Sequence, residues 1–326
     1  MNSEIMVSIC CMTFNHAKYV RDALEGFVNQ KTNFKYEVLI HDDASTDGTQ
    51  DIIKEYEEKY PDIIKPIYQT ENQYSQRVSI KKNFQIPRVK GKYVTLCEGD
   101  DYWTDPCKLQ KQVDFLESHP EYTLCATACT WMNLRDNIEQ NNFIIEKDMD
   151  IPVEDIILEK NGRIFPTVSI MVRQEIYTVV PEWFSAFSVG DIPLFINAGI
   201  IGKIRMLADN TCVYRWFASG SWTVSMESND YRINFKKRFI TAFETLNKAT
   251  NYKYDETIKK RIAHEEFTLA IVQNDWKKIR TYKNSDEWKE YSFTEKFNIF
   301  LACKFPKAKK ALTGMYRKIR RFKQKT

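Results

Sequence analysis

The segment "TLCEGDDYW", Thr95 to Trp103, decides the fold, because an apolar run typical of a strand ends there at three acidic residues. Glu98, Asp100 and Asp101 lie within four positions, so their like charges repel one another unless a group of opposite charge lies among them. In a parallel α/β sheet, ligands bind outside the carboxyl ends of the strands. The segment therefore predicts a buried strand that ends in a binding site.

The residues before this segment alternate between strand-like and helix-like runs. Strands are predicted at "MVSICCM" (6–12), "YEVLIHDD" (36–43), "IIKPIYQ" (63–69) and "KYVTLCEGDD" (92–101). Helices are predicted at 20–29, about 50–60, 78–86 and 107–118, with Thr46 or Asp47 as the cap of the second. This alternation predicts βαβ units, and the nearly continuous apolar strands predict a sheet buried on both faces.

A second acidic pair, Asp42 and Asp43, follows the strand at 36–43. Two such pairs at one edge of a sheet would be unfavourable without a cation, and carboxylates favour Mg²⁺ or Mn²⁺. Because Mg²⁺ usually completes its shell with phosphate oxygens, the pattern indicates a nucleotide diphosphate. The alternative is that each pair only caps the following helix.

The second half of the chain has a looser pattern. Apolar runs between Tyr122 and Phe217 predict mixed or antiparallel strands that extend the sheet, and the chain beyond Met226 reads as helical. We therefore predict one α/β domain over 1–224 and a helical extension over 225–326 that ends in a basic tail.

Composition excludes several other classes. The eight cysteines form no CxxC pair and the chain has only four histidines, so a zinc site is not expected. We expect the cysteines to be buried thiols in a reducing cytoplasm. No apolar run is long enough for a spanning helix, and no secretory signal is expected from the first residues.

Four segments together resemble the family 2 glycosyltransferases, which have the GT-A fold and use nucleotide-sugar donors. They are "VSICCMTFNHAKYVRDALEGFVNQ", "EVLIHDDASTDGT", "KNFQIPRVKGKYVTLCEGDDYW" and "GDIPLF", in the family's order, over about residues 6–223. In detail the block at 98–109 is similar to bacterial members that build capsular, lipopolysaccharide or other surface glycans. The resemblance implies a mixed, mostly parallel sheet flanked by helices.

The resemblance also implies roles for individual residues. Asp43 would bind the uracil ring, Asp100 the ribose, and Asp101 the metal that bridges the donor diphosphate. Glu98 holds the first acidic place of that motif, where Asp is more usual. The remaining donor-binding positions that the resemblance implies are Met12 and Thr13 through their backbone, Asn15, Asp42 and Asn83.

Asp191 matches the family's catalytic base, which removes a proton from the acceptor hydroxyl. An ordinary N-cap aspartate is the alternative, and spacing alone would favour it.

"CVYRWFASGSW" (212–222) is similar to a family stretch in which a histidine commonly helps the metal or diphosphate, but Phe217 holds that position here. Arg215 is expected either to face the leaving diphosphate or to form a structural salt bridge. Trp103 and Trp222 are the tryptophans expected near a sugar, with core packing as the alternative. His16 is expected to be a solvated loop residue.

Basic residues are concentrated in the C-terminal segment of the chain. Residues 303–326 carry ten Lys and Arg and no Asp or Glu, which leaves a net charge of −6 on the remainder. With apolar residues from Phe297 onward, residues 297–326 predict peripheral contact with an anionic membrane, with a solvated tail as the alternative. Nucleic acid is not an expected partner, because no nucleic-acid motif accompanies the charge.

These observations predict a metal-dependent, inverting glycosyltransferase that moves a sugar from a UDP-sugar to a glycan or lipid-linked acceptor in bacterial surface-polysaccharide synthesis. It is expected in the cytoplasm, at the inner face of the membrane. A non-catalytic subunit that binds a nucleotide sugar or glycan is the alternative, for which Phe217 is the only hint. A sugar nucleotidyltransferase is less consistent with the sequence, because such enzymes normally have a glycine-rich nucleotide loop near the N-terminus and "CMTFNHAKY" has no glycine. The sugar, the acceptor, the linkage and the oligomeric state are not predicted.

Overall fold

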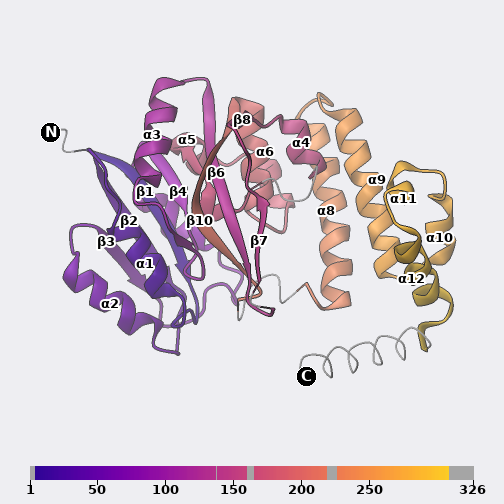
Figure 1. The fold of residues 1–326 in the computed structure, drawn as a ribbon, viewed down its shortest axis with the longest axis horizontal. Helices are drawn as coiled ribbons and strands as arrows, with labels where there is room; N and C mark the ends of the chain where they lie inside the picture. The colour runs from indigo at the N-terminus through magenta and orange to yellow at the C-terminus, as the bar shows by residue number, and fades with distance from the viewer. Residues whose placement is uncertain (1–3, 137, 160–164, 219–225, 308–326) are drawn as a thin grey trace. The chain divides into compact units, whose positions relative to one another are not determined.

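The structure is a computed structural model that describes residues 4–136, 138–159, 165–218 and 226–307. The chain forms two compact units (Figure 1). The first consists of residues up to Phe184 together with Val189–Ser225, and the second of Ser185–Ser188 and the residues from Met226 onward. We describe each unit by itself.

The first unit is built on one mixed sheet with the strand order β3-β2-β1-β4-β9-β6-β10-β5, with β7 paired to β6 and β8 to β10. Its strands are β1 (Ile5–Thr13), β2 (Lys35–Asp42), β3 (Ile64–Tyr68), β4 (Tyr93–Leu96), β5 (Tyr102–Trp103), β6 (Tyr122–Asn133), β7 (Ile138–Phe143), β8 (Met149–Asp150), β9 (Met171–Arg173) and β10 (Lys203–Trp216). The mostly parallel sheet predicted from the sequence is confirmed, including its mixed second half.

Six strands of this sheet run in the same direction. β1, β2, β3 and β4 pair in parallel, and β9 is antiparallel to both β4 and β6, so that β6 and its parallel neighbour β10 point the same way as β4. Their carboxyl ends therefore share one edge. β1 is followed along the chain by β2 on one side and later by β4 on the other, and such a reversal of strand order is where α/β sheets bind ligands.

Helices cover the apolar face of the β1–β4 part of the sheet. Val7, Ile9 and Cys11 of β1 share one core with buried side chains of α1, α2 and α3. The helical segments of this unit are α1 (Val20–Val28), α2 (Thr49–Lys59), η1 (Lys81–Gln85), η2 (Ile86–Arg88), α3 (Lys108–Ser118), α4 (Val153–Leu158), η3 (Thr167–Ser169), α5 (Gln174–Thr178), η4 (Glu182–Ala186, which reaches into the second unit) and α6 (Asp191–Ile201).

One local prediction holds only in part and another is wrong. The segment 78–86 is largely helical, as predicted, but it forms the short π-helix η1 and runs into the 3₁₀-helix η2 instead of an α-helix, because Pro87 has no N–H to continue an α-helical ladder. The N-cap of α2 is Gly48 rather than Thr46 or Asp47. Asp47 still accepts a hydrogen bond from the backbone N–H of Thr49, at 3.1 Å, so it supports the first turn from one residue further out.

Gly91, directly before β4, brings two backbone segments close together. A Cβ atom at this position would lie 2.4 Å from the backbone nitrogen of Ser8 and 2.6 Å from the carbonyl carbon of Val7. We expect Gly91→Ala to lower the free energy of unfolding by about 3 kcal/mol, because backbone atoms cannot move aside as a flexible side chain can. Urea denaturation measures this. Gly190→Ala, where a Cβ meets nothing within 4 Å, is the control, and equal losses in both variants would contradict the packing argument.

The second unit is helical. It contains α8 (Asn229–Ala249), α9 (Asp255–Val272), α10 (Trp276–Thr281), α11 (Asp286–Lys289) and α12 (Phe293–Lys304). Phe187 packs edge-on against Phe239 and Phe243 of α8. Phe267 of α9, Ile279 of α10 and Ile299 of α12 share a smaller core. Within the described ranges, no helix of either unit has both the length and the apolar character needed to cross a membrane.

Candidate active site

The two acidic turns predicted from the sequence flank the carboxyl end of β1. The Met12 carbonyl accepts a hydrogen bond from the N–H of Gly99 at 2.9 Å, and the Thr13 carbonyl accepts one from the N–H of Asp43, also at 2.9 Å. The backbone at Met12 and Thr13 therefore ties both turns to one strand end. The edge expected to bind the donor does carry both acid pairs.

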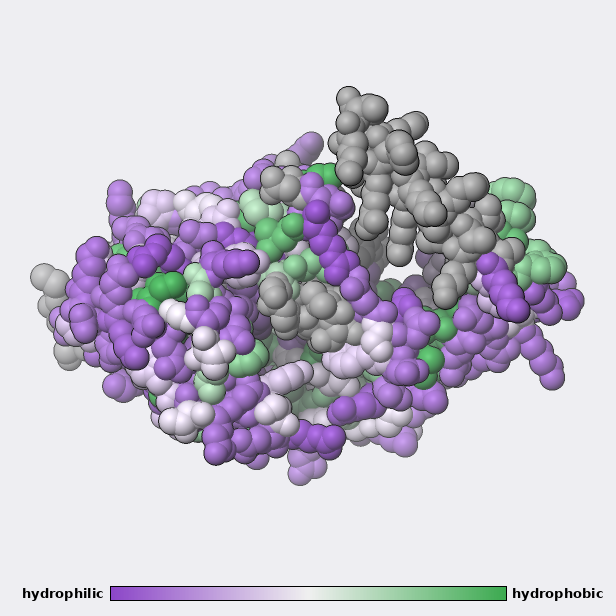
Figure 2. All heavy atoms as spheres, turned by 90° about the horizontal axis from the view of Figure 1, so that it is seen from below, coloured by the Kyte–Doolittle hydropathy of each residue, from purple (hydrophilic) through white to green (hydrophobic). Residues whose placement is uncertain are grey.

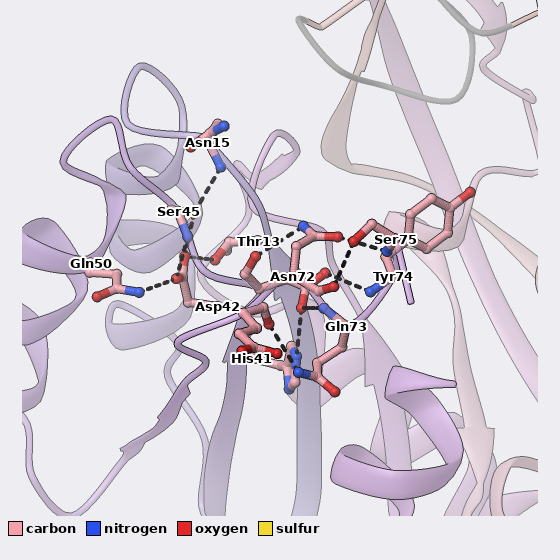
Figure 3. Close-up of polar contacts among 12 residues, drawn as sticks. Thr13, Asn15, His41, Asp42, Ser45, Gln50, Asn72, Gln73, Tyr74 and Ser75 are labelled. Carbon is pink, nitrogen blue, oxygen red and sulfur yellow. Dashed lines mark hydrogen bonds and ion pairs between the residues drawn. The ribbon is translucent and has the colours of Figure 1, made fainter. Parts of the chain in front are cut away.

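Asp42 is fully buried and its carboxylate is saturated by the protein (Figure 3). Oδ1 accepts hydrogen bonds from Ser45 N at 3.0 Å and Gln50 Nε2 at 2.7 Å, and Oδ2 accepts them from Thr13 Oγ1 at 2.9 Å and Ser45 Oγ at 2.5 Å. The carboxylate therefore holds the loop after β2 in place. Asp42 is one of the residues predicted to bind the sugar donor, and in the structure its carboxylate bonds to this loop.

Asp42→Ala is expected to lower the free energy of unfolding by about 3 kcal/mol, because four donors lose their acceptor in a buried place. Thermal and urea denaturation measure this loss, and the Michaelis constant for the donor should rise because the loop is displaced. Asp51→Ala on α2, whose carboxylate is largely exposed, should leave both quantities near wild type. A stable Asp42→Ala protein would show that the loop does not depend on this carboxylate.

Asp43 braces a different loop (Figure 3). Its carboxylate accepts hydrogen bonds from the backbone N–H groups of Gln73, at 2.7 Å, and Tyr74, at 3.0 Å, and its own carbonyl accepts one from Asn72 Nδ2 at 3.1 Å. The His41 Nε2 atom lies 3.7 Å from Asp43 Oδ1, and burial lowers the pKa of His41. The loop at 72–74 thus belongs to the site, although its sequence gave no indication of this.

Asp100 and Asp101 are neighbouring buried acids, and among the hydrogen bonds and ion pairs of the described residues none joins a cationic side chain to either carboxylate. Asp101 is 2% exposed, and its Oδ1 accepts a hydrogen bond from the backbone N–H of Arg215 at 2.8 Å. Burial, and then the charge of Asp100, raise the pKa of Asp101 well above its ordinary value, and burial also raises the pKa of Asp100. A divalent cation would offset both effects.

The Arg215 side chain contacts protein groups around the turn that carries Asp100 and Asp101. Its guanidinium forms an ion pair with Asp22 of α1, donates a hydrogen bond to the carbonyl of Asp100 at 3.2 Å, and lies 4.3 Å from the centroid of the Tyr102 ring. Of the two expectations for Arg215, the structure supports the salt bridge. Asp22 is a contributor that the sequence did not reveal.

His16 is also part of the site, contrary to the expectation of a solvated loop residue. It is 9% exposed, and its Nδ1 atom would lie 3.0 Å from a Cβ atom placed on Gly99. The same Cβ would lie 2.5 Å from Thr13 Cγ2. Only glycine fits between β1 and this side chain, which explains the glycine of the EGDD turn.

Asn15 and Asn83 differ in their placement. Asn15, at a φ of 56°, donates its backbone N–H to Ser45 Oγ at 2.8 Å and accepts a hydrogen bond from Thr46 N at 2.9 Å. It therefore joins the end of β1 to the loop after β2. Asn83 is exposed on η1, and among the hydrogen bonds of the described residues none joins its side chain to the acidic turns.

Trp103 and Trp222, expected near a sugar, and Phe217, at the position of the family's histidine, have three different outcomes. Trp103 is 4% exposed, donates its indole N–H to the Val168 carbonyl at 3.1 Å and packs against Phe27, so it is a core residue and that expectation is corrected. Trp222 lies outside the described residues. Phe217, at a φ of 64°, stacks on Trp216 with the Arg135 guanidinium carbon 3.9 Å from its ring centroid.

Asp191 is the first residue of α6 and is partly exposed. Its Oδ1 accepts a hydrogen bond from the Ile192 N–H at 2.8 Å. α6 leads through Gly202 directly into β10, and the Ala198 carbonyl accepts a hydrogen bond from Thr123 Oγ1 at the start of β6. Ala198, near the end of the helix, therefore lies beside the start of β6, and Asp191 lies at the opposite end of the helix.

The acidic residues after β4 fit a cation that takes some of its ligands from the protein and the others from a phosphate group. Within the described residues, no group of three or more His, Cys, Asp or Glu side chains is placed to hold a metal ion. Glu98 is exposed, whereas Asp101 is buried beside Asp100. Mg²⁺ and Mn²⁺ accept one or two carboxylates and take their other ligands from phosphates and water. The chain thus supplies the part of such a site that a diphosphate would complete.

Comparison with known proteins agrees with this arrangement. The sequence model of "Glycosyl transferase family 2" matches residues 8–178. An uncharacterised protein of Mycobacterium bovis is 36% identical over 226 residues, which are 66% of this chain and 60% of that protein. The match thus spans less than two thirds of that relative. The putative teichuronic acid biosynthesis glycosyltransferase TuaG of Bacillus subtilis is 27% identical over 251 residues, 72% of this chain and 92% of TuaG.

A further relative is named for its activity. The UDP-Glc:alpha-D-GlcNAc-diphosphoundecaprenol beta-1,3-glucosyltransferase WfaP of Escherichia coli is 27% identical over 146 residues, 45% of this chain and 49% of WfaP.

Solved structures show the same fold at low sequence identity. The mannosyltransferase PcManGT of Pyrobaculum calidifontis, in complex with GDP-Man and Mn²⁺, has a TM-score of 0.56 and 18% identity, over 96% of this chain and 84% of that one. TarS 1–349 of S. aureus with UDP-GlcNAc has a TM-score of 0.54 and 16% identity, over 92% and 79% of the two chains. The GT-A fold expected from the sequence is confirmed.

Proposed function

The chain belongs to glycosyltransferase family 2, and from this premise we propose that it is an inverting enzyme with a UDP-sugar as donor. Its acceptor is a hydroxyl of a glycan or lipid-linked glycan in bacterial cell-surface polysaccharide synthesis. The observation that supports this most directly is the buried pair of Asp100 and Asp101 at the carboxyl end of β4, whose charges call for a cation and a diphosphate. The activities for which the relatives TuaG and WfaP are named support a role in cell-surface glycan synthesis.

In this proposal the two acidic turns divide the recognition of the donor between them. Asp43, with the backbone at Met12 and Thr13, recognises the uracil ring, and Asp100 the ribose. Asp101, with Glu98, would hold a Mn²⁺ or Mg²⁺ ion, which supplies positive charge beside the departing diphosphate when it is bound. The complex of PcManGT with Mn²⁺ supports the choice of ion.

The transfer itself is a single displacement. Asp191 removes the proton of the acceptor hydroxyl, the hydroxyl oxygen forms a bond to the anomeric carbon, and the bond from that carbon to the phosphate oxygen breaks. UDP leaves with the electron pair of that bond. Because the attack is in line with the leaving group, an α-linked donor gives a β-linked product.

A UDP-release assay tests this function. Wild-type protein is offered a panel of nucleotide sugars with Mn²⁺, Mg²⁺ or EDTA, with and without lipid-linked acceptor. Release from one donor that EDTA abolishes would identify the donor and support the proposal. If the protein binds UDP with metal but releases none from any donor with acceptor present, it is instead the non-catalytic subunit that Phe217, in place of the family's histidine, suggests.

We further propose that the enzyme works in the cytoplasm, in peripheral contact with the inner face of the membrane through residues 297–326. The support is the charge of this segment, which has no Asp or Glu. Residues 308–326 of this segment lie outside the described residues.

A further inference from the structure

The last helix of the second unit, α12, has apolar side chains on the side that faces away from its core. Phe293 is 84% exposed, Phe297 is 50% exposed, and Phe305, which caps the helix, is 54% exposed. With Leu301 these residues follow a spacing of four, which places them along one side of the helix. We call this set, Phe293, Phe297, Leu301 and Phe305, the phenylalanine stripe.

The opposite side of α12 is already used by the fold. Ile299 is buried against Phe267 and Ile279, and Cys303, one turn later, packs against the same core. Ile299 lies two positions, or about 200°, around the helix from Phe297. A helix that is apolar on both sides needs a partner on each. The core supplies one, and Figure 2 shows hydrophobic atoms at the surface over the α10–α12 end of this unit.

The charges around the stripe identify the kind of partner. Glu295 is engaged in the capping box with Ser292, and after it the chain has no Asp or Glu to its end. Lys296, Lys304 and Lys307 are the basic residues of the described part, and eight further Lys and Arg follow between 309 and 325. Glu295 lies between Phe293 and Phe297, but every charged residue after it is a cation. Exposed phenylalanines next to such a run of cations match the interface of an anionic bilayer, where rings enter the acyl boundary and cations meet the headgroups.

We propose that the phenylalanine stripe of α12 docks the enzyme on an anionic lipid surface, with Phe293 and Phe297 inserted below the headgroups. This inference rests on the proposed membrane contact and names the helix face that makes it. It does not depend on catalysis, because neither residue belongs to the candidate active site.

The experiment is co-sedimentation of the full chain with vesicles of phosphatidylcholine, with or without phosphatidylglycerol. The double variant Phe293→Ser and Phe297→Ser is expected to lower the partition coefficient for the anionic vesicles at least tenfold, an order of magnitude set by the apolar area withdrawn from the interface. Tyr252→Asn is the matched control, because Tyr252 is 58% exposed in the same unit and Asn tolerates its φ of 59°. It should bind like wild type.

Three results would overturn the proposal. The first is binding of the double variant to anionic vesicles as strong as that of wild type, and the second is equal binding of wild type to neutral and anionic vesicles. The third is a wild-type dimer that light scattering shows to be monomeric in the double variant, which would assign the stripe to a second copy of the chain. A direct readout accompanies these: Phe293→Trp should add fluorescence that brominated lipids quench. UDP release from the donor with a water-soluble acceptor, measured without vesicles, should be unchanged in the double variant, so a failure of docking is separable from a failure of the proposed reaction.

Discussion

Asp191→Asn is expected to lower the rate of sugar transfer by about a thousandfold, the middle of the range that a positioned general base contributes. The amide cannot accept the proton of the acceptor hydroxyl. It keeps a carbonyl oxygen that can accept the Ile192 N–H as Asp191 Oδ1 does now. The fold and the binding of UDP should therefore be preserved, and isothermal titration with UDP and Mn²⁺ should give a wild-type dissociation constant.

A matched control is Asp286→Asn, which changes the first residue of another helix, α11, in the same way. It should transfer sugar at the wild-type rate. If Asp191→Asn also transferred at the wild-type rate, another group would have to be the base. If it lost UDP binding together with transfer, Asp191 would act on the donor and not on the acceptor.

Asp101→Asn is expected to abolish metal-dependent UDP release, a loss of at least a thousandfold, because the charge that would hold the cation is removed. Titration of Mn²⁺ in the presence of UDP should show at least a hundredfold weaker binding. Asp114→Asn on α3, an exposed acid whose carbonyl oxygen can keep the hydrogen bond from Gln110, is the control. Release that persisted in Asp101→Asn would move the metal to other ligands.

The same substitution should stabilise the metal-free protein. Burial raises the pKa of Asp101 in the folded state, so the folded protein loses stability as the pH rises above the ordinary pKa of the carboxyl, about 4. The amide has no charge to bury, and its oxygen can still accept the Arg215 N–H. The melting temperature of the variant should therefore exceed that of wild type, and the difference should grow from pH 4 toward neutral pH. A difference that shrank as the pH rose would contradict this sign.

Sequence reasoning predicted the parts of the site that depend on one strand and its end. The strands that carry Asp43 and Asp101 are apolar nearly throughout, so their direction and the shared edge followed from periodicity and the rules of parallel sheets. The same reasoning left the roles of the acids to the family resemblance, because a saturated acid such as Asp42 and a poorly compensated one such as Asp101 look alike in a sequence.

The parts that could not be predicted depend on tertiary contacts between distant segments. Arg215 pairs with Asp22, a separation of 193 residues, and no local pattern links them. The bracing of residues 73 and 74 by Asp43 uses backbone N–H groups, which every sequence has. Trp103 is predicted near a sugar because tryptophan rings can stack on sugar faces, yet its ring packs against Phe27. The identity of a residue does not reveal which way its ring points.

The three-residue strand β9 has a consequence for how the chain folds. It joins β4 to β6 through pairs separated by about 80 and about 50 residues, whereas β1, α1 and β2 are neighbours along the chain. Closing such long loops is slow, so we expect the β1–β2–β3 part to form early and the joint at β9 to close late. The hydrogen bond between Arg215 N and Asp101, which spans 114 residues, would then form only after that closure. Pulse-labelling hydrogen exchange during refolding would follow this order. A chain arrested before this closure would have the loop that Asp43 holds in place but would lack the contact that positions Asp101.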